Sequence, residues 1–208
     1  MYSRTDWSEH FSQGRGFRPL GAREKDLLGE QVPAPHDGRA LDACCGSGEL
    51  AVHLASLGYT VDGADFAEGA LARARSERAG SKGVRWLCLD VEADELAGLA
   101  EEGYDLITVR LAAPFFRDRT RVLRRLAVRL RAGGALVVIT PVVENTPERR
   151  RNIALDEDEL ALLGEGFATA GRFDADGLAF VVLRGPGAPF TAAERNRPAP
   201  GRCSAPQR

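Results

Sequence analysis

The stretch Leu41-Asp-Ala-Cys-Cys-Gly-Ser-Gly-Glu-Leu50 decides how this chain is expected to fold. It starts at the end of a short apolar run, passes through a turn that contains Gly46 and Gly48, and continues into a helical pattern. Glycines let a backbone come close to a ligand, and the first turn of a helix offers it unpaired N–H groups. The stretch therefore predicts a strand, a ligand-binding turn and a helix, in that order.

Apolar runs and helical patterns alternate along the rest of the chain. Strands are expected at residues 39–44, 59–65, 84–90, 104–110 and 135–140, and helices at 49–56, 68–78, 94–100, 119–130 and 156–163. This alternation predicts a parallel sheet covered by helices on both faces. Two further strand candidates, 167–173 and 178–183, are joined by a turn too short for a parallel crossover, so they should form an antiparallel hairpin at one edge.

The sequence divides into three segments. Residues 1–36 carry aromatic and basic side chains and a short periodic stretch, which predict a helical extension that ends at Pro33 and Pro35. Residues 37–185 form the α/β domain. Residues 186–208 are rich in proline and poor in large apolar side chains, so a flexible tail is expected there.

Bulk composition argues against several classes of protein. The chain has 208 residues, 44% hydrophobic and 28% charged, which is typical of one globular domain. A net charge of −2 gives no general attraction to nucleic acid or to an anionic membrane. No apolar run approaches the ~20 residues of a membrane helix, and the polar N-terminus has no secretory signal pattern, so a cytoplasmic location is expected.

The cysteines and histidines form no metal-binding pattern. The four cysteines, at positions 44, 45, 88 and 203, contain no C-x-x-C pair, and the three histidines have no spacing that suggests a ligand set. We therefore expect packed, reduced thiols and no bound metal.

Three carboxylates lie where a ligand of this fold would bind, and two of them, Asp42 and Asp90, favour one ligand over another. Asp65 ends the second predicted strand, where it could accept both hydroxyls of a ribose, but this suits a nicotinamide dinucleotide as well as S-adenosylmethionine. Asp42 precedes the glycine turn, where it would repel a pyrophosphate and attract an ammonium group. Asp90 ends the third strand, where it could hold an adenine amine. Asp42, Asp90 and the C-terminal hairpin, which has no place in the dinucleotide fold, favour S-adenosylmethionine.

In order and spacing, residues 30–185 resemble the class I S-adenosylmethionine-dependent methyltransferases. The resemblance rests on five segments: Asp42-Ala-Cys-Cys-Gly-Ser-Gly, Val61-Asp-Gly-Ala-Asp-Phe-Ala, Asp90-Val91, Tyr104-Asp-Leu-Ile and Leu130-Arg-Ala-Gly-Gly-Ala-Leu. It implies a three-layer, Rossmann-like α/β fold with a seven-stranded, mostly parallel sheet and an antiparallel C-terminal edge hairpin. The sequence departs from the family pattern at Cys44, where the family has its first glycine.

The resemblance also assigns cofactor contacts by position. The methionine part of S-adenosylmethionine would be bordered by Cys44, Gly46 and Gly48. The ribose and the adenine would be held by Asp65, Phe66, Asp90 and Val91.

Three arginine-containing segments have more than one interpretation. Arg110 directly follows the fourth strand, where it could contact the cofactor or the substrate, or instead brace a loop. Arg15 could fold over the cofactor together with Phe17 and pair with its carboxylate. The arginine-rich stretch 117–131 keeps an intact apolar face, so a solvated helix is preferred there to a nucleic-acid surface.

The predicted function is methyl transfer from S-adenosylmethionine to a small molecule, with secondary metabolites among the candidate acceptors. No catalytic base is assigned, because orientation alone can supply ~7–11 kcal/mol; His10 and Glu144 are the first candidates for mutation. Val109-Arg-Leu-Ala replaces the Asn-Pro-Pro-aromatic element of enzymes that methylate nucleic-acid amines, so a nucleic-acid acceptor is not expected. A homodimer could complete the pocket. The alternatives are a cofactor-binding module without methyl transfer, as a regulatory or partner subunit, and a nicotinamide-dependent reductase.

Overall fold

The computed structural model describes residues 3–92 and 95–186. Its helices are α1 (Arg4–Ser12), α2 (Ala22–Gln31), α3 (Glu49–Ser56), α4 (Glu68–Glu77), α5 (Arg119–Ala127) and α6 (Glu157–Leu163), with short 3-10 helices η1 (Ala113–Phe115), η2 (Val143–Asn145) and η3 (Glu148–Ile153). Its strands are β1 (Arg39–Ala43), β2 (Thr60–Asp65), β3 (Val84–Cys88), β4 (Tyr104–Arg110), β5 (Leu130–Pro141), β6 (Phe167–Ala175) and β7 (Leu178–Pro186). Apart from Pro186, the segment expected to form a flexible tail lies outside the described residues.

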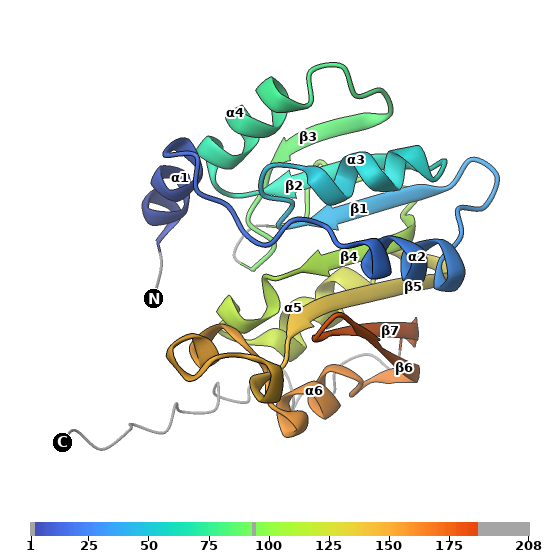
Figure 1. The fold of residues 1–208 in the computed structure, drawn as a ribbon. Coiled ribbons are helices and arrows are strands. Elements are labelled where there is room, and N and C mark those ends of the chain that lie inside the picture. The colour runs from blue at the N-terminus through green and yellow to red at the C-terminus, as the bar shows by residue number, and fades with distance from the viewer. Residues whose placement is uncertain (1–2, 93–94, 187–208) are drawn as a thin grey trace.

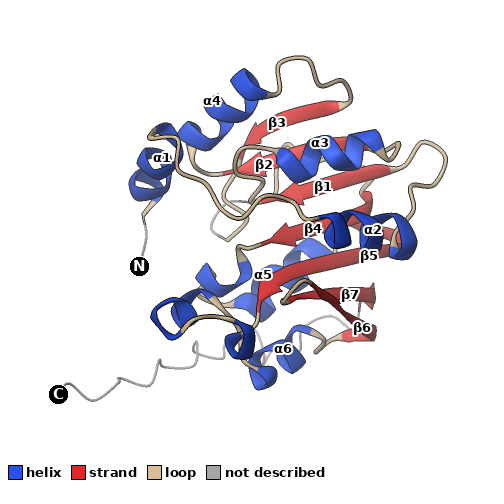
Figure 2. Cartoon of the chain, in the orientation of Figure 1, coloured by secondary structure: helices blue, strands red, loops and turns tan. Residues whose placement is uncertain are grey.

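The seven strands form one sheet in the order β3-β2-β1-β4-β5-β7-β6 (Figures 1 and 2). Strands β1 to β5 are parallel, whereas β7 runs antiparallel to β5 and pairs with β6 in a hairpin. Asp176 and Gly177 make the hairpin turn, with φ values of 55° and 84° that match the twist of the two strands. The predicted α/β fold with its antiparallel edge hairpin is confirmed.

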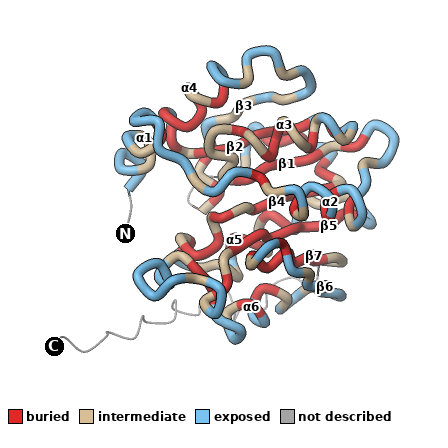
Figure 3. The backbone as a smooth tube through the Cα atoms, viewed as in Figure 1, coloured by how far each residue is buried: buried red, intermediate tan, exposed pale blue. Residues whose placement is uncertain are grey.

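The sheet separates two apolar cores, as the alternation along β5 shows. Leu136 and Val138 belong to the core formed with α5 and α6, whereas Val137 and Ile139 belong to the core formed with α2 and α3. This period of two is what a strand buried on both faces requires. Figure 3 shows the buried residues concentrated in the central strands and on the inner sides of the helices.

The strand order reverses at β1, and this reversal positions the site. Strands β2 and β3 lie on one side of β1, and β4 and β5 lie on the other. The connections that follow β1 and β4 therefore diverge and leave a crevice at the carboxyl ends of the strands. The segment between α1 and α2 crosses this edge of the sheet (Figure 1).

Helix α1 packs against the start of α4 at a close backbone contact. The amide of Gly69 donates to Ser8 Oγ at 2.9 Å. A Cβ at Gly69 would lie 2.2 Å from the Ser8 carbonyl oxygen, so a side chain there would push α1 away from the domain. No helix in the described ranges combines the length and the hydropathy needed to cross a membrane.

The short helix predicted at 94–100 is wrong for the part that the structure describes, residues 95–100, which form turns and irregular chain. Side chains satisfy the backbone groups there: the Ala100 amide donates to Tyr104 Oη at 2.9 Å, and its carbonyl accepts from Arg129 Nη2 at 2.8 Å. Arg85 Nη2 donates to the Gly98 carbonyl at 3.0 Å. These bonds take the place of helical ones.

The predicted helix at 119–130 is three residues shorter in the structure and ends at Ala127. Leu130 already pairs with Tyr104 as the first residue of β5, so the strand begins before the glycines at 133 and 134 rather than after them.

Candidate functional site

The crevice holds a cavity of ≈ 560 Å³. Its walls come from the N-terminal segment, the turn after β1, the ends of β2, β3 and β4, and η1. Most of the residues assigned to the cofactor from the sequence line this one cavity: Asp42, Cys44, Gly46, Asp65, Phe66, Asp90, Val91 and Arg110. Gly48 and Arg15 are not among its lining residues.

The turn between β1 and α3 uses left-handed backbone at three positions. Cys44, Gly46 and Gly48 have φ values of 60°, 54° and 79°. Gly46 lies under the Phe11 ring of α1, where a Cβ would come within 3.1 Å of the ring. The small size of residue 46 therefore lets α1 close over the turn.

Gly48 serves packing rather than the cavity. A Cβ at Gly48 would lie 2.2 Å from the ring of Trp86, which extends from β3 across the start of α3. The same ring would be 2.6 Å from a Cβ at Gly63 in β2. The two glycines thus make room for one indole, and Trp86 packs with the core on that face, as the sequence interpretation preferred.

Cys44 is a non-glycine residue in a conformation that favours glycine. Left-handed backbone costs an L-residue roughly 1–2 kcal/mol. Burial raises the pKa of the Cys44 thiol well above its usual value, as it does for Cys45, so both thiols stay protonated at neutral pH. They are suited to packing, not to nucleophilic attack.

Cys44→Gly should be more stable than Cys44→Ala by about 1 kcal/mol. Both substitutions remove the thiol, but only alanine keeps a Cβ in the left-handed conformation. Urea denaturation of the two variants measures the difference in their free energies of unfolding. Equal stabilities, or a more stable alanine variant, would contradict the φ of 60° at this position.

Asp42 is a buried carboxylate with one unsatisfied oxygen. Thr108 Oγ1 donates to its Oδ1 at 2.9 Å, whereas Oδ2 has no hydrogen-bond partner among the described residues. Burial raises the pKa of Asp42 to about 7, against the smaller lowering effects of Thr108, Arg110 and the Ala51 amide. An acceptor of this kind, in a residue that lines a cavity, favours a cationic donor on the ligand.

Asp65 joins the glycine turn to the start of α4. Its Oδ2 accepts from the Gly46 amide and its Oδ1 from the Ala67 amide, both at 2.9 Å. Burial raises the pKa of this carboxyl, and the two amides partly oppose the rise. Each oxygen keeps a further acceptor position, so the carboxylate can still bind hydroxyl donors.

The neighbouring wall combines a carboxylate and an aromatic ring. Asp90 follows β3 and accepts from the Glu92 amide at 2.9 Å. Phe66 follows β2, and the Arg4 guanidinium lies 5.5 Å from its ring centroid while donating to its backbone carbonyl at 3.1 Å. Val91 lines the cavity and is buried in the core formed with α5 and α6.

Arg110 braces the N-terminal segment at the edge of the cavity. Its guanidinium donates to both carboxylate oxygens of Glu24, at 2.7 and 2.9 Å, and Glu24 is fully buried. It also donates to the carbonyls of Arg18 and Pro19, each at 3.0 Å. The contacts favour the loop-bracing role, although Arg110 also lines the cavity. No local feature of the sequence identifies Glu24 as its partner.

Three candidates lie away from the cavity. The Arg15 side chain donates to Gln13, and its carbonyl accepts from Arg73, so the expected contact with the cofactor carboxylate has no support in this geometry. His10 stacks on Phe17 outside the lining, and burial lowers its pKa. Glu144 is exposed.

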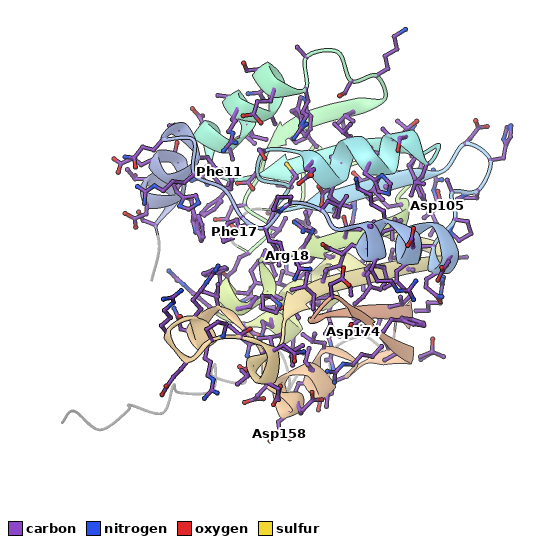
Figure 4. All side chains as sticks on the ribbon, in the orientation of Figure 1. Phe11, Phe17, Arg18, Asp105, Asp158 and Asp174 are labelled. Atoms are coloured by element: carbon purple, nitrogen blue, oxygen red, sulfur yellow. The ribbon has the colours of Figure 1, made fainter. Side chains whose placement is uncertain are left out.

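The sequence interpretation placed Phe17 over the cofactor but did not recognise the aromatic wall to which it belongs. Trp7 lies 5.6 Å from Phe17 and 5.1 Å from Phe115 between ring centroids, and all three line the cavity with Phe11. Figure 4 shows Phe11, Phe17 and Arg18 following one another along the N-terminal segment. The close spacing of aromatic residues at positions 7, 11 and 17 was the feature of the sequence that could have indicated this wall.

Comparison with known proteins identifies the central segment. Residues 41–138 match the family model described as "Methyltransferase domain". This segment is a class I S-adenosylmethionine-dependent methyltransferase domain.

The methyltransferase domain has curated relatives that are longer than this chain. A malonyl-[acyl-carrier protein] O-methyltransferase of Enterobacter lignolyticus is 31% identical over 142 residues, 68% of this chain and 53% of that protein. Methyltransferase GfsG of Streptomyces halstedii is 31% identical over 151 residues, 72% of this chain and 51% of that protein. The chain thus spans about half the length of these relatives.

The fold of the methyltransferase domain also recurs in solved structures. The N-methyltransferase NodS of Bradyrhizobium japonicum superposes with a TM-score of 0.59 at 18% identity, over 78% of this chain and 93% of that one.

S-adenosylmethionine is the cofactor of this domain family, and the cavity fits it. The unsatisfied Oδ2 of Asp42 suits an ammonium group. Further carboxylates line the cavity and suit a ligand that also carries a positive sulfonium: Glu49, Asp65, Asp90 and Glu92. Among the described residues, no group of three or more histidine, cysteine or acidic side chains could hold a metal ion.

Proposed function

We propose that this protein transfers a methyl group from S-adenosylmethionine to a small-molecule acceptor. The observation that carries the proposal is the convergence of Asp42, Asp65 and Asp90 on one cavity beside the glycine turn. The cofactor presents an ammonium group, two ribose hydroxyls and an adenine amine, all of them donors that carboxylates accept. Three acceptors from three successive strands match these three groups.

Each wall residue has a binding role in this proposal. Asp42 Oδ2 would hold the ammonium group, and the free acceptor positions of Asp65 would hold the ribose hydroxyls. Asp90 would hold the adenine amine, with Phe66 and Val91 against the ring faces. Gly46 keeps the turn low enough for α1 to cover it.

The chain's main chemical contribution would be orientation. When bound, the cofactor supplies an electrophilic methyl group, so the protein has to hold the acceptor in line with it. The wall of Trp7, Phe17 and Phe115 would exclude water and confine the acceptor. Arg110 would act as a positioning residue, because it fixes the segment that carries Phe17.

We also propose a cytoplasmic setting and an acceptor other than nucleic acid. Cys44 and Cys45 are free thiols, as a reducing compartment would keep them. The net charge of −2 offers no general attraction to a polyanion.

Asp65→Ala should weaken binding of S-adenosylhomocysteine at least tenfold, because the ribose would lose charge-assisted bonds worth roughly 1.5–3 kcal/mol each. Isothermal titration calorimetry should show that the wild-type protein binds S-adenosylhomocysteine with micromolar affinity and does not bind NADH. Asp65→Asn keeps the size of the side chain and separates lost charge from a loosened turn. Asp174→Ala, at an exposed position in β6, is the matched control.

Three outcomes would count against parts of this proposal. Unchanged affinity in both Asp65 variants would contradict the ribose assignment. Binding of NADH in place of S-adenosylhomocysteine would favour the nicotinamide-dependent reductase. Cofactor binding without turnover across a broad metabolite panel would favour the binding module.

A further inference from the structure

A second, smaller cavity of ≈ 180 Å³ lies beside the first. The two cavities share four lining residues: Phe17, Arg18, Leu111 and Phe115. Apolar side chains continue the lining of the second cavity toward the end of β5, η3 and β7: Pro141, Pro147, Ile153 and Leu178. A molecule in the first cavity could therefore extend past the shared residues into a second, mainly apolar space.

Two phenylalanine rings form the boundary between the cavities. Phe17 comes from the N-terminal segment and Phe115 from η1, and their ring centroids are 6.4 Å apart at an interplanar angle of 55°. Trp7 contacts both rings edge-on or at a tilt. The two rings therefore contact each other, and their remaining faces and edges can make offset or edge contacts with a flat, apolar or aromatic ligand body.

The lining of the second cavity carries positive charge, from Arg18 at the boundary with the first cavity and from Arg150 in η3. Arg18 and Arg150 both line it, and neither forms an ion pair with a carboxylate of the described residues. Arg18 donates instead to the backbone carbonyl of Asp176 at 2.9 Å. Asp176 is the acidic residue of the lining, and its carboxylate lies near Arg18 without forming an ion pair with it: a Cβ at Gly21 would be 3.6 Å from Asp176 Oδ2 and 4.0 Å from Arg18 Nη2. Arg150 is therefore the guanidinium of this lining that an anionic ligand can use.

We propose that this second cavity binds the distal end of the methyl acceptor, and that the acceptor has a flat apolar body that ends in a carboxylate. The body would lie against the faces and edges of Phe17 and Phe115, and the carboxylate would lie at Arg150. An arginine guanidinium matches a carboxylate in shape as well as in charge. This inference rests on the proposed methyl transfer, since it places the other end of the same molecule beside the cofactor.

The test compares para-hydroxycinnamate with its uncharged amide, para-hydroxycinnamide, on the full chain saturated with S-adenosylhomocysteine. Ligand-observed NMR titration should show the acid binding at least tenfold more tightly than the amide. Arg150→Gln should weaken binding of the acid at least fivefold and leave that of the amide within twofold. Arg149→Gln, a change of the exposed neighbour in η3 that does not line the cavity, should alter neither.

Several outcomes would overturn the proposal. These are equal affinities for acid and amide, equal effects of the Arg149 and Arg150 substitutions, or no binding of either compound to the S-adenosylhomocysteine complex. S-adenosylhomocysteine affinity is measured for each variant as a check on the fold. If the wild-type protein itself does not bind S-adenosylhomocysteine, the proposed function has failed. The acid and the amide are then compared on the protein without that ligand.

Discussion

Asp42→Asn should make the ligand-free protein more stable at pH 8 and, at the same time, weaken its binding of S-adenosylhomocysteine. Burial raises the pKa of Asp42 from 3.8 to about 7, so the folded protein holds this proton more tightly than the unfolded chain does. The stability that results is fully present below pH 4 and is lost as the pH rises through about 7. Asparagine carries no charge and keeps an oxygen that can accept from Thr108.

The stability difference should therefore grow with pH. Near pH 4 the variant and the wild type should unfold at similar urea concentrations. At pH 8 the variant should be more stable by about 4 kcal/mol, which corresponds to the difference between a pKa of 3.8 and one of about 7. Asp174→Asn, at an exposed site on β6, is the control and should change the stability neither at pH 4 nor at pH 8 (Figure 4).

The substitution that raises stability should lower the affinity for S-adenosylhomocysteine. Under the proposed function, ionised Asp42 binds the ammonium group of the cofactor, so the wild-type affinity for S-adenosylhomocysteine should rise between pH 6 and pH 8, while the affinity of the variant should be at least tenfold lower and flat. A difference in stability that does not change with pH would show that Asp42 does not titrate near 7. A gain in stability without a loss of affinity would place the ammonium group elsewhere.

The order of elements could be predicted because each strand, turn and helix carries its own local signal. The observed bounds of α3 and β4 are the predicted ones, and the hairpin follows from a turn too short for a crossover. The convergence of Asp42, Asp65 and Asp90 was also predictable, because the carboxyl ends of parallel strands share one edge of the sheet.

Pairings between distant segments could not be predicted in this way. Arg110 and Glu24 are 86 positions apart, and neither neighbourhood contains a pattern that names the other. The sequence predicted that the segment bearing Arg15 and Phe17 folds over the ligand, but it did not show which of its side chains face the cavity. As a result Phe17 and Arg18 line the cavity, whereas Arg15 turns away.

Gly48 shows the same limit of prediction from sequence. The motif glycine was recognised, but the reason that position 48 needs a glycine was not. Glycine there was attributed to close approach of a ligand, yet the close approach is made by Trp86. A motif residue can thus be required for packing between β3 and the start of α3. Its effect on the ligand would then be indirect, through the position of the turn.

Gly48→Ala should destabilise the protein by about 2–5 kcal/mol. Left-handed backbone at a φ of 79° costs alanine roughly 1–2 kcal/mol, and forcing a Cβ to within 2.2 Å of the Trp86 ring adds an overpacking cost of roughly 1–3 kcal/mol. Gly14→Ala is the matched control, because Gly14 has a similar φ of 73° but a Cβ there would meet no atom within 4 Å. It should show the backbone cost alone.

A double-mutant cycle separates the two costs within Gly48→Ala itself. In a Trp86→Leu background the indole is gone, so the penalty of Gly48→Ala should fall to that of Gly14→Ala, a coupling of about 1–3 kcal/mol. Urea denaturation of the four proteins of the cycle measures it. An unchanged penalty would mean that backbone strain alone makes glycine necessary at position 48. The full coupling would mean that Trp86 on β3 imposes part of the requirement for glycine at position 48, so Gly48→Ala should be better tolerated when Trp86 is replaced as well.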